Sequence, residues 1–171
     1  MRHWAVWTVL LLGGLVAVAV AGGRSEKNDP AVARTRKTVR MLDDIYKTAV
    51  VLITKHYVND ESDLPAGSAA IALFAAIKDK GWHEVRLLDA TGEPMEEANL
   101  PRDEFEKSAV AALKSGKSYY EQVVVKNGRR YLRAATPLPV VMKKCTMCHP
   151  HYESYKKGEP IGALSYTLPI E

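Results

Sequence analysis

The sequence has only two cysteines, Cys145 and Cys148, among its 171 residues. A structural zinc site needs a second pair of ligands, and no other cysteine is available to complete one. No catalytic triad, paired carboxylate site or phosphate-binding loop stands out, so we expect no enzyme. The formal net charge is only +4 and most acids and bases are interleaved, which argues against a nucleic-acid partner.

Both cysteines belong to one pentapeptide, Cys145-Thr146-Met147-Cys148-His149. Two thiols at this spacing can each form a thioether with one haem vinyl group, and the adjacent imidazole can bind the iron. A thioredoxin-like dithiol would need a βαβ context and no histidine, whereas a simple disulfide is a remaining alternative. The motif therefore predicts one covalent c-type haem, with His149 as the proximal ligand.

The first 21 residues predict a signal peptide or an N-terminal membrane anchor. Arg2 and His3 precede an apolar run, and Ala19-Val20-Ala21 resembles a small-x-small cleavage site. The run is close to the length of a membrane span, so residues 4–21 could instead remain as a membrane tether.

Three segments are thus expected: a signal or anchor over residues 1–21, a polar tether over 22–30, and one folded domain over 31–171. In either form the domain is expected outside the cytoplasm, in the periplasm or an equivalent space. That location agrees with the motif, because bacteria attach c-type haem after export.

Apolar periodicity and turn residues predict an α+β domain in which helices fill the first half and antiparallel strands the second. Helices are expected over residues 31–58, 65–80 and 101–116. Strands are expected over 85–88, 119–126, 129–136 and 161–170, the middle two forming a hairpin around Asn127-Gly128. Pro137 and Pro139 are expected to end the second hairpin strand.

One apolar stripe of the long first helix is expected to face the core. Its members recur every three or four residues: Leu42, Ile45, Ala49, Leu52 and His56. Because His56 continues this stripe, it is our first choice for a second axial iron ligand. A core histidine with an ordinary polar partner is the alternative reading, and His83 or a methionine could also bind. His151 is too close to His149 in the chain to reach the other haem face.

Arginines in the predicted strands could pair with the haem propionates, because a guanidinium suits carboxylates bidentately. Arg133 is the preferred candidate, since among them it lies nearest the motif in the chain. A solvated strand charge is the alternative for each: Arg86, Arg129, Arg130 and Arg133.

Several segments of this sequence occur in the same order as in a known protein family. Gly81-Trp82 leads into strand 85–88, Phe105-Glu106 follow, and the runs YLRAATPL (131–138) and IGALSYTLPI (161–170) flank the C-x-x-C-H. In this order they resemble the PAS-like single-haem c-type cytochrome domain family, found in small exported haem proteins and in sensory regions of bacterial kinases and chemoreceptors. The resemblance implies a PAS-like antiparallel sheet with flanking helices and a covalent haem near the last strand. Some members use a cysteine of the N-terminal helix as second axial ligand, and this chain has none there.

Two functions agree with these features. The first is electron transfer through an Fe(III)/Fe(II) couple with a redox partner protein. The second is sensing of redox state or a gas, with the signal passed to a partner protein. No kinase or methyl-accepting segment accompanies the domain in this sequence, so we expect electron transfer.

Overall fold

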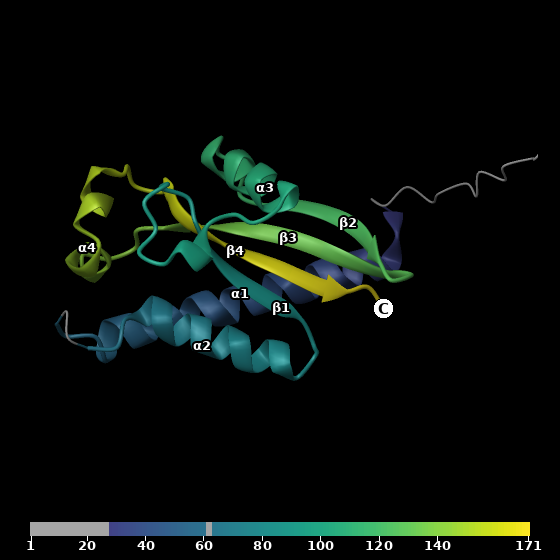
Figure 1. Ribbon diagram of the computed structural model, residues 1–171, viewed down its shortest axis with the longest axis horizontal. Helices are drawn as coiled ribbons and strands as arrows, with labels where there is room; N and C mark the ends of the chain where they lie inside the picture. The colour runs from purple at the N-terminus through teal and green to yellow at the C-terminus, as the bar shows by residue number, and fades with distance from the viewer. Residues whose placement is uncertain (1–27, 61–62) are drawn as a thin grey trace, which may run out of the picture.

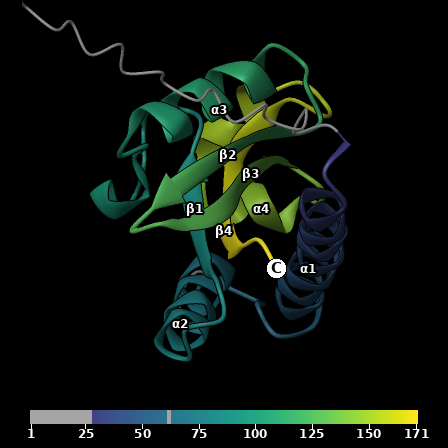
Figure 2. The ribbon, with the colours of Figure 1, turned by 90° about the vertical axis from the view of Figure 1, so that its right-hand side faces the viewer.

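The structure, a computed structural model, describes residues 28–60 and 63–171. The expected signal or anchor over residues 1–21 lies outside the described residues. The fold is α+β: a four-stranded antiparallel sheet in the order β1-β4-β3-β2 carries helices on both faces (Figures 1 and 2). This confirms the expected class. In the described ranges, no helix combines the length and the apolar character needed to cross a membrane.

Two helices, α1 (Pro30–His56) and α2 (Ala66–Asp79), cover one face of the sheet (Figure 2). Asp29 caps α1, because its carboxylate accepts the backbone N–H of Ala31 at 2.9 Å. The helix therefore begins where the sequence predicts, at the end of the segment expected as a tether. Gly81, with φ of 74°, follows the last turn of α2 in a conformation that favours glycine.

The predicted hairpin is confirmed. Asn127 and Gly128 both have positive φ, 52° and 74°, which is the conformation of a type I′ turn. The four strands are β1 (Glu84–Asp89), β2 (Tyr120–Lys126), β3 (Arg129–Pro139) and β4 (Pro160–Pro169).

The expected break at Pro137 and Pro139 is wrong, because β3 continues through both prolines. Pairing with β2 ends where Tyr120 faces Ala135, whereas pairing with β4 continues to Pro139. Beyond Ala135 one side of β3 is therefore an edge, where a missing N–H costs no ladder hydrogen bond.

The two faces of β4 have different partners, as its alternating pattern predicts. Leu164, Tyr166 and Leu168 are buried in the core that the sheet forms with α1 and α2. Ala163 lies on the opposite face, in a second cluster beneath a third helix.

The expected core stripe of α1 is wrong at three positions. Ile45 and Leu52 are 53% and 49% exposed, and His56 is exposed as well. The buried face is a neighbouring stripe that contains Val32, Val39 and Tyr46 and, as partly buried members, Leu42 and Val50. Ile71 of α2 is also exposed, whereas Phe74 is buried in the core.

The third helix, α3 (Glu104–Lys114), covers only part of the other sheet face. It begins after Asp103, whose carboxylate accepts the N–H of Glu106 at 2.9 Å, and so starts later than predicted. Phe105, Ala109 and Leu113 bury its apolar side against the sheet. A helix of this length spans about 16 Å, whereas β4 spans about 33 Å, so α3 is too short to cover this face from end to end.

A short helix, α4 (Lys144–Cys148), and the 3-10 helix η3 (Pro150–Ser154) lie between β3 and β4. They project from one end of the sheet (Figure 1, left), away from the hairpin turn. The β1–α3 connection contains one further 3-10 turn, η2 (Glu97–Asn99).

Candidate haem-binding site

The two cysteines lie on the single short helix α4. The N–H of Cys145 donates to the carbonyl of Met142 at 3.1 Å, which closes the first turn. Residues three apart on a helix lie on one side of it, so Cys145 and Cys148 share a face. Both thiols are free and half-buried. The arrangement can present two sulfur atoms to one flat ligand.

His149 ends α4 and lies half-buried directly after the second thiol. Its Nδ1 atom is buried and has no hydrogen-bond partner among the described residues. Burial lowers the pKa of His149, the neighbouring His151 lowers it further, and the charge of Asp89 partly opposes both. The ring is therefore held in its neutral form, which is the form that binds a metal.

A tyrosine holds the ring of His149 in place. Tyr152 stacks on it with centroids 4.5 Å apart and planes 11° from parallel. Burial raises the pKa of Tyr152 to about 12, so its hydroxyl stays protonated. Sequence analysis gave Tyr152 no role. Its signal was the proline after His149, which favours a 3-10 turn that brings side chains three residues apart into line.

Lys144 ties the motif to the end of α1. Its ammonium group donates to the backbone carbonyls of Lys55, at 3.1 Å, and Val58. The carbonyl of Lys55 lies in the last turn of α1, where carbonyls lack a helical N–H partner and a nearby cation is stabilising, and Val58 follows just after the helix. Sequence analysis gave Lys144 no role, since its partners lie more than 80 residues away in the chain.

His56 is in the last turn of α1, one residue from the carbonyl that Lys144 binds. The structure therefore brings the element that carries His56 against the motif, although the side chain is exposed rather than buried. Leu52 and Tyr57 are exposed near this end of α1, and Val141 is exposed just before α4. These apolar side chains offer the kind of surface that a porphyrin covers.

Arg133 lies elsewhere. Its guanidinium donates to Asp103 at 2.6 Å, lies 3.7 Å from Glu106, and stacks over the ring of Phe105, all near or in α3. The structure thus gives Arg133 other partners and lends no support to a propionate contact. His83, the alternative axial ligand, is hydrogen-bonded to the hydroxyl of Tyr46 at 2.8 Å.

Residues 29–169 match the model of the Tll0287-like family, described as Tll0287. The match runs from the cap of α1 to the last residue of β4 and includes the whole C-x-x-C-H motif. The chain therefore belongs to the Tll0287-like family. A comparison with curated proteins gave no match.

The residues of this site fit a covalent haem. The two free thiols share one helical face, and the neutral imidazole with an unpartnered nitrogen follows them directly. Val141, an exposed apolar residue, lies four residues before Cys145 in the chain.

Proposed function

We propose that this protein is an exported c-type haem protein that transfers electrons. Cys145 and Cys148 would hold the haem through thioethers, and His149 would be its proximal ligand. The observation that carries the proposal is the C-x-x-C-H on α4, with both thiols free and the imidazole of His149 stacked on Tyr152. When bound, haem supplies a one-electron iron couple whose potential depends on axial ligands and burial.

The surrounding residues would position the group and set its environment. Tyr152 stacks on the His149 ring and would hold the plane of this imidazole where it binds the group. Lys144 anchors α4 to α1 and so fixes the thiols relative to the domain. The charge of Asp89 near His149 would favour the oxidised, more positive iron.

Electron transfer is supported by the place of the motif. It lies at one end of the molecule, on a short helix that projects from the sheet, where a partner protein can approach (Figure 1). Electron-transfer encounters use small interfaces, and exposed apolar residues at this end, such as Tyr57 and Val141, suit one.

Sensing is the second candidate, and the Lys144 contact favours it. Through this contact a change at the motif would reach the last turn of the 27-residue helix α1, which runs along the sheet to its far end. Such a helix could pass a shift at the iron to a partner protein.

We further propose a PAS-like fold, a location outside the cytoplasm and His56 as the sixth iron ligand. The antiparallel sheet with flanking helices supports the first, and the apolar start of the sequence supports the second. The contact between α1 and α4 supports the third. We propose no enzymatic activity.

Optical spectra of the oxidised and reduced holoprotein, with and without carbon monoxide, test this function. A six-coordinate low-spin iron that does not bind carbon monoxide is the expected result for electron transfer. The variant His56→Ala should open the iron to carbon monoxide, whereas His83→Gln, which removes the alternative ligand that is hydrogen-bonded to Tyr46, should not. Free carbon monoxide binding by the unmodified protein would contradict the electron-transfer proposal and favour sensing.

A further inference from the structure

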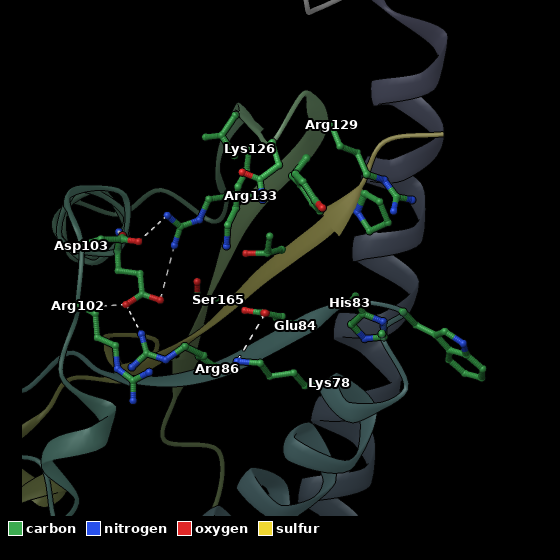
Figure 3. A pocket seen from close by; sticks show the side chains of 18 residues that line it. Lys78, His83, Glu84, Arg86, Arg102, Asp103, Lys126, Arg129, Arg133 and Ser165 are labelled. Carbon is green, nitrogen blue, oxygen red and sulfur yellow. Dashed lines mark hydrogen bonds and ion pairs between the residues drawn. The ribbon is translucent and has the colours of Figure 1, made fainter.

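The part of the outer sheet face that α3 leaves uncovered forms a cavity with a volume of about 650 Å³ (Figure 3). Its floor consists of outward-facing side chains of neighbouring strands, among them Arg86 of β1, Ser165 of β4 and Arg133 of β3. Glu84, at the start of β1, lines this cavity, whereas Asp89, at the end of β1, lies near His149. Arg86, which also lines the cavity, is three residues from Asp89 on β1, about 10 Å along the strand.

The lining of the cavity is basic. Six of its side chains are cationic and three are anionic, which leaves an excess of three positive charges. The cationic residues are Lys78, Arg86, Arg102, Lys126, Arg129 and Arg133, and the anionic ones are Glu84, Asp103 and Glu106.

The acids neutralise the cations unevenly. Glu106, whose side chain is only 3% exposed, lies between Arg86 and Arg133 and forms an ion pair with each. Glu84 pairs with Lys78 at 3.6 Å. The floor of the cavity is therefore largely balanced.

The rim is not balanced. Among the described residues, neither Lys126 nor Arg102 has an ion pair, and Arg102 donates its guanidinium only to the carbonyl of Ala98. Arg129 pairs with Glu171 at 2.9 Å, but both side chains are more than half exposed, and such pairs contribute little. In Figure 3, Lys126 and Arg129 lie on one side of the cavity and Arg102 on the other.

We propose that this cavity binds a small organic anion with two or more acidic groups. The cations on each side of the rim would bind one acidic group of the ligand, and the arginines would do so through bidentate hydrogen bonds. The hydroxyls of Ser165 and Thr167 on the floor would donate to oxygen atoms between them. Carboxylates and phosphates share this chemistry. The proposal does not depend on haem, because neither cysteine of the motif nor His149 lines the cavity.

Isothermal titration calorimetry of the purified holoprotein tests the proposal. Citrate and inorganic phosphate are the anionic probes, and glycerol is the neutral control. The cavity variant is Lys126→Gln with Arg102→Gln, two exposed side chains whose loss breaks no ion pair. The matched control is Lys37→Gln with Lys157→Gln, which removes the same charge from exposed positions outside the cavity.

We expect saturable binding of at least one anion, weakened about tenfold or more in the cavity variant and unchanged in the control. Hydrogen exchange of the complex should show new protection in residues 124–133 and 165–169. Stronger binding of citrate than of phosphate would identify a polycarboxylate, and the reverse order a phosphorylated ligand. If both variants lose anion affinity equally, the loss reflects net charge alone and the proposal is overturned. The proposal is also overturned if the protein binds neither citrate nor phosphate.

Discussion

Replacing Glu106 tests how α3 is fixed on the sheet. One carboxylate oxygen accepts from the guanidinium of Arg86 and from the N–H of Arg102 at 2.8 Å, and the other lies 3.7 Å from Arg133. The variant Glu106→Ala leaves both guanidinium groups without this counter-charge. Their side chains are only 21% and 17% exposed, so water replaces the lost partner poorly.

Breaking a buried ion pair by removing one partner costs about 3–5 kcal/mol. Because Asp103 still holds Arg133, we expect the lower end, about 3 kcal/mol of unfolding free energy. For a chain of this size the loss corresponds to a fall of roughly 6–12 °C in Tm. Glu106→Gln keeps a hydrogen-bond acceptor without the charge, and should cost about half as much.

Urea unfolding of the variants, followed by circular dichroism, measures the change as a shift of the midpoint at constant m-value. The control is Glu104→Ala on the same helix, since that side chain is 88% exposed and pairs only with Lys107. We expect the control within about 0.5 kcal/mol of the unmodified protein. If Glu106→Ala also stays within about 1 kcal/mol, the ion-pair argument is refuted.

Three further changes probe other parts of the fold. Gly162→Ala should lose about 1–3 kcal/mol in urea unfolding, because a Cβ there would meet the backbone oxygen of Leu88 at 2.7 Å; wild-type stability would refute that contact. Burial lowers the pKa of His83 below its ordinary 6.5 in the folded protein. As the pH falls, the unfolded state therefore binds a proton at this residue before the folded state does. The unfolding free energy should then fall as the pH drops below 6.5, with a smaller slope in His83→Gln; equal slopes would contradict this. Lys144→Gln should speed hydrogen exchange at the end of α1 and cost about 1 kcal/mol, while Lys143→Gln should do neither.

The parts of the fold that local chemistry determines were predictable. Asp29 with the proline after it predicts the start of α1, and Asn127-Gly128 predicts the hairpin turn. The continuation of β3 through Pro137 was not predictable in this way. It depends on which strand lies beside that residue, and β2 has already ended there.

The buried face of α1 was mispredicted because the helix is apolar on two sides. The stripe through Ile45 and Leu52 and the one through Val39 and Tyr46 both have helical spacing. Periodicity alone does not say which of them faces the sheet. The choice depends on tertiary packing against β3 and β4.

The candidate site could be predicted only where it is contiguous in the chain. The C-x-x-C-H is one pentapeptide, so haem attachment can be predicted from the sequence without a structure. The contacts of Lys144 with the end of α1 join residues more than 80 positions apart. Arg133 was chosen for its closeness to the motif in the chain, but the six residues that follow it in β3 extend over about 20 Å.

The central claim is that Cys145 and Cys148 hold a haem covalently. The most direct measurement is the intact mass of the protein exported with its haem, after denaturation and acid–acetone extraction. We predict the mass of the polypeptide plus one haem, with both thiols unavailable to alkylation, and a lower yield of this species in Cys148→Ser. A polypeptide of unmodified mass with two reactive thiols, or a haem that extraction removes, would contradict the account.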